Sequence, residues 1–173
     1  MLSTRRTRHL VAASVLSVAM VTSLTACSSG FYAATGLQGA SGNGANTNLG
    51  DLQIRDITIV KVDGSPQGTI IGTIVNRGSE ADALTGVRLV GTPGTATIGG
   101  TAAVGGALPL PQSSSTRIGY NAEDHVDITG LEATPTQYVQ VELQFQRAGT
   151  VRMDVMAVPP TGIYEGIAPL GTS

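Results

Sequence analysis

Apolar and polar residues alternate with a period of two through most of the chain after Asp51. In the stretch Leu52–Val62 the apolar positions begin on even numbers and switch to odd numbers at Ile57. A period of two is typical of a β-strand with one buried face, and one extra residue in a strand reverses the phase. The stretch therefore predicts a strand with a β-bulge near Arg55 and Asp56.

Further short segments rich in Val, Ile and Thr follow, separated by Gly, Pro and Asn. They predict strands at Thr69–Val75, Asp82–Val90, Thr95–Ile98 and Val126–Leu131, and a closing hairpin of Val139–Phe145 with Val151–Ala157. No helical stripe competes with this pattern, so we expect an all-β fold. We predict an immunoglobulin-like or cupredoxin-like β-sandwich of about seven to nine strands over residues 51–160. Gly99–Ser115 is predicted to be a long surface loop, and residues 161–173 a loose C-terminal tail.

The N-terminus has the pattern of an export signal. Arg5, Arg6 and Arg8 precede an uncharged and mostly apolar run from Leu10 to Ala26. A basic segment followed by an apolar run and small residues is typical of a signal peptide. The alternative is a membrane-spanning helix, for which the run of 17 residues is at the short limit. We predict a signal peptide at residues 1–26.

The only cysteine, Cys27, follows directly after Leu24-Thr25-Ala26. This arrangement resembles the lipobox of bacterial lipoproteins. The resemblance implies that the chain is cut before Cys27 and that the Cys27 thiol carries diacylglycerol. Each buried CH₂ of an acyl chain contributes about 0.8 kcal/mol, so two or three chains would hold the protein on the outer face of the cytoplasmic membrane. Residues 27–50, which are rich in Gly, Ser and Asn, predict a flexible tether after this cysteine.

Charge and composition exclude several function classes. The chain has ten Lys and Arg, three of them before Cys27, and twelve Asp and Glu, all after it. The part after the predicted cut therefore has seven basic and twelve acidic side chains, a balance of −5, which argues against nucleic-acid binding. It contains one Lys, one His and no Trp, and the phosphate-binding, zinc-protease and redox motifs are absent from the sequence. We predict that the protein is not an enzyme.

One cluster of ionisable residues stands out, at Glu123–Asp127, where three carboxylates and the only His after Cys27 fall within five residues. If the segment is extended, His125 and Asp127 project from the same face and could hold a divalent ion together with a third group. The alternative is a solvated acidic loop before the next strand. Met153 and Met156 are three positions apart and would face opposite sides of a strand, so Met153 is predicted to be a core residue rather than a copper ligand.

Two stretches resemble the periplasmic copper chaperone family called PCu(A)C. Gly130–Val158 is similar to the closing hairpin of that family, and Asn76–Gly86 is similar to its upstream pattern of Asn, Gly and Ala-Asp. The resemblance implies a cupredoxin-like fold for about Asp51–Val158. It also extends to small actinobacterial cell-envelope lipoproteins that are distant relatives of these chaperones.

The copper ligands of this family, two His and two Met, carry over only in part. His125 falls on the His of the family's His-x-Met pair, whereas Asp127 stands at the Met position. The other His falls near Gly99 or Gly100, and no Met follows there before Met153. Three of the four ligands are thus missing. An imidazole with a carboxylate suits Cu(II) or Zn(II) better than Cu(I).

The sequence therefore favours a non-enzymatic lipoprotein, tethered to the membrane, that presents a β-sandwich to a partner in the cell envelope. The edges of the sandwich and the Gly99–Ser115 loop would form the binding surface. One alternative is a copper-handling chaperone of PCu(A)C type with a degenerate site at His125 and Asp127. Another is a carrier of a soluble ligand or lipid, with a cavity between the sheets.

Overall fold

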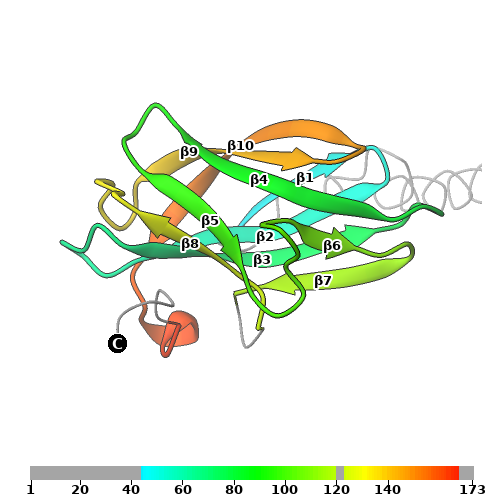
Figure 1. Ribbon diagram of the computed structural model, residues 1–173. Coiled ribbons are helices and arrows are strands. Elements are labelled where there is room, and N and C mark those ends of the chain that lie inside the picture. Colours follow the sequence, from blue (N-terminus) through cyan, green and yellow to red (C-terminus); the bar gives the residue numbers. More distant parts are fainter. Residues whose placement is uncertain (1–43, 120–122, 168–173) are drawn as a thin grey trace, which may run out of the picture. The chain divides into compact units, whose positions relative to one another are not determined.

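The computed structural model describes residues 44–119 and 123–167, and in these ranges the chain forms ten β-strands and one short 3₁₀ helix (Figure 1). The strands are β1 (Ala45–Leu49), β2 (Leu52–Val60), β3 (Gly68–Asn76), β4 (Asp82–Val90), β5 (Thr95–Gly99), β6 (Leu108–Leu110), β7 (Ser114–Ile118), β8 (His125–Thr129), β9 (Tyr138–Phe145) and β10 (Gly149–Val158), and the helix is η1 (Gly162–Tyr164). The predicted all-β class is confirmed, and so is the closing hairpin, which is β9 and β10.

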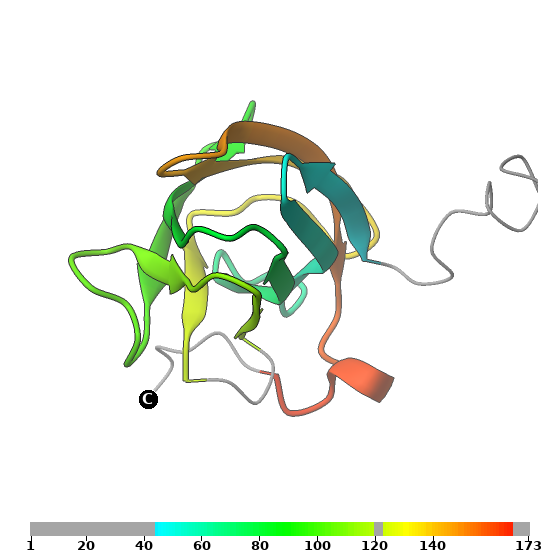
Figure 2. The ribbon, with the colours of Figure 1, turned by 90° about the vertical axis from the view of Figure 1, so that its right-hand side faces the viewer.

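The strands form two sheets that join along one parallel contact. The first sheet contains β1, β2, β3, β5, β7 and β8, and the second contains β4, β6, β9 and β10. They join where Ala157 and Val158 of β10 pair with Ile59 and Val60 of β2. The predicted sandwich therefore closes along one side, and Figure 2 shows its barrel-like outline.

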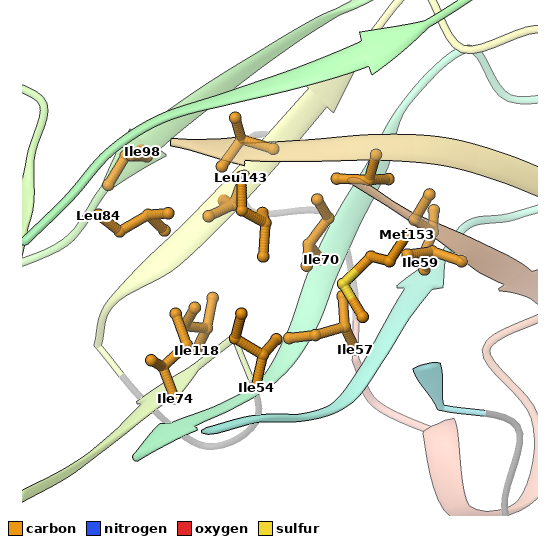
Figure 3. Close-up of a cluster of buried hydrophobic side chains, with 14 of the residues drawn as sticks. Ile54, Ile57, Ile59, Ile70, Ile74, Leu84, Ile98, Ile118, Leu143 and Met153 are labelled. Carbon is orange, nitrogen blue, oxygen red and sulfur yellow. The ribbon is translucent and has the colours of Figure 1, made fainter. Parts of the chain in front are cut away.

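Aliphatic side chains from both sheets fill the interior. Ile54 and Ile59 of β2, Ile70 of β3 and Leu84 of β4 are each at most 1% exposed, and Figure 3 shows them among the side chains of this core. Met153 is 8% exposed and lies in the same cluster, which confirms it as a core residue. Full burial of each such side chain contributes about 1.5–3 kcal/mol, so this core is the main source of stability.

The predicted bulge lies in β2. The pairing of β2 with β3 shifts register between Arg55 and Thr58, and Asp56 has a φ of 54°. The backbone N–H of Asp56 donates to Oδ1 of Asn46 in β1 at 3.0 Å, so the neighbouring strand stabilises the bulged residue. The extra residue brings Ile57 back to the interior, where it is fully buried. This is the physical cause of the phase change in the sequence.

The folded domain begins earlier than predicted, because β1 lies inside the segment 27–50 that the composition assigned to a tether. β1 pairs with β2, and the guanidinium of Arg55 donates to the carbonyl oxygen of Thr47 at 2.7 Å and to Oδ1 of Asn48 at 2.6 Å. Its residues are only half-buried or exposed, so the strand has no apolar pattern. The predicted signal peptide, Cys27 and the rest of the predicted tether lie outside the described residues.

The predicted loop Gly99–Ser115 is also shorter than expected, because it contains β6 and the first residues of β7. Leu108 and Leu110 of β6 are fully buried, whereas Pro109 between them is exposed. β6 pairs only with β4, and an edge strand of this kind tolerates a proline that cannot donate a hydrogen bond. The parts of the predicted loop outside strands are therefore residues 100–107 and 111–113.

The C-terminal segment packs against the outside of the first sheet, at least as far as Ile167. Ile167 is 8% exposed and joins a second apolar cluster with Val60, Ile71 and Val158, against which Met156 is packed. The prediction of a loose tail was therefore wrong for residues 161–167. Within residues 44–119 and 123–167, no helix combines the length and apolarity that a membrane span requires.

Candidate functional site

The His125–Asp127 pair lies on β8, which is held between β5 and β3. Gly99 of β5 is the cross-strand partner of His125, and Thr97 is the partner of Asp127. Val126 between them is fully buried, so the two polar side chains project from the outer face of the sheet. Nε2 of His125 lies 3.6 Å from Oδ2 of Asp127, and each side chain is about a quarter exposed, at 23% and 26%. The prediction that they share a face is confirmed.

The His125 ring is oriented by its neighbours. Nδ1 lies 3.1 Å from the carbonyl oxygen of Glu123, so Nδ1 is the nitrogen that donates and Nε2 is the one that faces Asp127. A Cβ atom placed on Gly99 would lie 2.6 Å from Nε2. The ring therefore occupies the space that a side chain at position 99 would need. Gly99 is one of the two positions at which the family resemblance places a second His ligand, and that ligand could not stand beside His125 in this arrangement.

His125 and Asp127 are the two candidate metal ligands that the structure brings together at this place. Two ligands of a tetrahedral zinc ion lie about 3.4 Å apart, given bond lengths of about 2.0–2.2 Å, so the separation of Nε2 and Oδ2 fits two vertices. Among residues 44–119 and 123–167, however, no group of three or more His, Cys, Asp and Glu side chains could hold a metal ion. The structure thus brings together two candidate ligands, Nε2 of His125 and Oδ2 of Asp127.

The other carboxylates of the acidic cluster hold the chain that follows β5. Oε2 of Glu123 accepts a hydrogen bond from the hydroxyl of Thr101 at 2.6 Å, and Oδ1 of Asp124 accepts one from the backbone N–H of Ala102 at 2.9 Å. The carbonyl oxygen of Asp124 also accepts from the N–H of Gly119 at 2.7 Å. Neither acidic residue is therefore simply solvated, as the alternative interpretation of the sequence supposed. They are structural links between two connections that are far apart in the sequence.

Sequence reasoning missed the tight turn at residues 102–107 that these links support. Beyond Ala102 the chain makes a two-residue turn through Gly105 and Gly106, and Val104 next to it is 75% exposed. The Gly-Gly pair is a hairpin signal in the sequence. This hairpin signal is weak because the flanking residues are small and show no alternation of apolar and polar positions.

Three hollows on the described surface are small. One of about 270 Å³ is lined in part by Asp51, Asn76, Asp82 and Arg147. The Asp82 carboxylate accepts hydrogen bonds from the backbone N–H groups of Arg147 and Ala148, both at 2.9 Å. Two others, of about 290 Å³ each, lie at loops that flank Glu132. All three volumes fall below the usual range for small-molecule sites, about 300–1,000 Å³.

The comparisons with known proteins place the domain by its fold. The sequence matches no known protein-family model and no curated protein. Among solved structures, a copper-bound PCuAC domain from PmoF2 superposes with a TM-score of 0.59 and 21% identity, covering 67% of this chain and 99% of that domain. An apo PCuAC domain from PmoF1 gives a TM-score of 0.59 and 20% identity, covering 67% of this chain and 100% of that domain.

The fold is that of PCuAC domains. The resemblance of Gly130–Val158 and Asn76–Gly86 to this family is thereby confirmed at the level of the fold. Both stretches act in folding: the first forms β9 and β10, and the second contains Asn76 and Asp82, whose side chains bind backbone groups of other segments. The PCuAC fold is therefore present here with the imidazole of His125 and the carboxylate of Asp127 at the place of the family's His-x-Met pair.

Proposed function

We propose that this chain is a non-enzymatic lipoprotein of the cell envelope, anchored to the outer face of the cytoplasmic membrane, whose PCuAC-type domain binds a protein partner. The N-terminal basic segment, the apolar run and Cys27 after Leu24-Thr25-Ala26 support the anchor. The described domain begins at Gly44, so 17 Cα–Cα steps separate it from the acylated residue. As a Gly-rich coil these steps span about 21–25 Å, which keeps the partner close to the membrane.

The observation that carries the binding function is the local structure around His125. A chain that kept this fold for copper transfer would be expected to keep converging ligands there. Instead, Gly99 leaves room for the His125 ring alone, and the carboxylates of Glu123 and Asp124 are used to fix the neighbouring connection. The hydrogen bonds of Glu123 and Asp124 hold the surface around residues 101 and 102 in one shape. A surface of fixed shape favours recognition of a protein, because shape complementarity is high and little ordering is needed on binding.

The test uses the full-length chain at its native expression level. Membranes are solubilised in mild detergent, and the chain is isolated together with its partner. We expect one envelope protein to co-purify in a fixed ratio and to recover this chain when that protein is isolated in turn. A wild-type chain that always elutes alone, at the mass of a monomer in detergent, would contradict the proposal. Replacement of Cys27 by Ala is the matched control for the anchor and should move the protein out of the membrane fraction.

A second candidate function, metal handling, is favoured by one observation. Nε2 of His125 and Oδ2 of Asp127 are spaced as two ligands of a divalent ion would be, and one of the similar PCuAC domains is described as copper-bound. This candidate predicts that His125→Ala abolishes a measurable affinity for Cu(II) or Zn(II). Equal binding by the wild type and the variant would exclude it.

A further inference from the structure

The connection between β5 and β6 ends in a tight turn, called the hairpin tip here and defined as residues 102–107. The N–H of Val104 donates to the carbonyl oxygen of Ala107 at 2.9 Å, and the N–H of Ala107 donates back to Val104 at 3.1 Å. Gly105 and Gly106 have φ values of 60° and 81°. Two successive positive φ values define a type I′ turn, which glycine adopts without strain. The hairpin tip therefore has a defined conformation instead of being an open loop.

The hairpin tip is also fixed on both sides. Before it, Glu123 and Asp124 bind Thr101 and Ala102. After it, Leu108 begins β6 and is fully buried in the core. These contacts join the tip to the residues before β8 and, through β6, to β4. The tip therefore loses little conformational entropy when it binds a partner.

The surface of the hairpin tip is apolar and uncharged. Val104 is 75% exposed, and no atom lies within 4 Å of a Cβ placed on Gly105 or Gly106, so the turn projects into open space. No charged residue occurs anywhere between Arg88 and Arg117. A single exposed valine is common on protein surfaces; this one is held beside a turn of defined conformation.

The base of the hairpin tip has the opposite character. Glu123 is exposed and Asp124 is half-buried, and both lie against residues 101 and 102. Surfaces of anionic lipids attract Lys and Arg, so these carboxylates oppose insertion of the tip into such a bilayer. They would complement a protein pocket with a basic rim, because complementary charges favour one docking orientation.

We propose that the hairpin tip inserts Val104 into an apolar pocket on the extracytoplasmic part of the partner protein, and that Lys or Arg side chains of the partner rim face Glu123 and Asp124. This inference rests on the proposed function, since it names the surface by which the partner is bound. It assigns the acidic cluster a role in both supporting and orienting the tip.

The test compares Val104→Asp with the matched variant Val62→Asp in the full-length chain. Val62 is 49% exposed and lies in the connection between β2 and β3. Both variants place one carboxylate on an exposed valine, so an unchanged unfolding midpoint in each is the folding control. We expect Val104→Asp to lower the amount of partner recovered per chain at least tenfold and Val62→Asp to stay within twofold of the wild type. A photo-cross-linking residue at position 104 should give a covalent product with the same partner.

The outcomes separate this inference from the proposed function. If Val104→Asp recovers as much partner as the wild type, the hairpin tip is not the docking surface, although the proposed function stands. If the residue at position 104 cross-links to lipid and not to protein, the inference is also overturned, because the tip then contacts the bilayer. If the wild-type chain recovers no partner at all, the proposed function itself fails, and the inference fails with it.

Discussion

Replacement of Asn76 by Ala should remove a large part of the stability of the domain. Asn76 ends β3, is 2% exposed, and joins three backbone groups. Its Nδ2 donates to the carbonyl oxygens of Glu80 at 2.9 Å and of Leu110 at 3.0 Å, and its Oδ1 accepts from the N–H of Gly78 at 2.9 Å. The bond to Leu110 links β3 of the first sheet to β6 of the second.

The size of the effect follows from which of these bonds are buried. The bonds to Leu110 and Gly78 are buried, whereas the bond to Glu80 is partly open to solvent. A buried polar group that loses its partner costs about 1–3 kcal/mol. Two such groups give a loss of about 2–6 kcal/mol, out of a total free energy of unfolding of about 5–15 kcal/mol for a domain of this size.

The assay is urea unfolding, followed by circular dichroism, of a chain that begins at Gly42. Ser79→Ala is the matched control, since Ser79 is exposed in the same connection and should change the free energy of unfolding by no more than about 0.5 kcal/mol. The Asn76→Asp variant keeps the shape but cannot donate to the two carbonyl oxygens when ionised, so it should lose stability as the pH rises from about 4 to 7. A loss of less than about 1 kcal/mol in Asn76→Ala would refute this reasoning.

Two further predictions concern buried ionisable groups. Hydrogen bonds from the side chains of Gln144 at 3.0 Å and Arg152 at 2.7 Å hold the pKa of Glu142 below its ordinary value. Glu142 therefore stabilises the fold above the pKa it has when unfolded, and this contribution disappears as the pH falls through its folded pKa. The difference in urea midpoint between the wild type and Glu142→Gln should shrink from about pH 5 to pH 3, and a constant difference would contradict the assignment. Lys61 is 2% exposed and donates to the carbonyl oxygen of Ala133, so Lys61→Ala should cost about 2–4 kcal/mol in urea unfolding. Lys61→Met keeps most of the volume and should cost less; equal losses would show that filling the space does not matter.

The features that sequence analysis predicted correctly are those with a local cause. The bulge at Asp56 changes the phase of the apolar positions within one strand, so it is visible in a stretch of ten residues. The shared face of His125 and Asp127 follows in the same way from the alternation of an extended chain. Neither prediction needs knowledge of which segments are neighbours in space.

The features that sequence analysis missed depend on distant partners. β1 is a strand because β2 lies beside it and Arg55 binds two of its residues, while its own composition is that of a linker. The roles of Glu123 and Asp124 depend on residues 101 and 102, which are more than twenty positions away. Gly99 gains its importance only from the register that places it opposite His125. None of these pairings leaves a periodic signal in a single sequence.

We propose that this PCuAC fold serves recognition of a protein and not copper transfer. Calorimetric titration of the chain from Gly42 with Cu(I), Cu(II) and Zn(II) tests it most directly, with His125→Ala and Asp127→Asn measured alongside the wild type. We expect the wild type to bind none of the three metals more tightly than the two variants do. Binding in the micromolar range or tighter that is lost in His125→Ala would contradict this proposal and support copper or zinc handling by the domain.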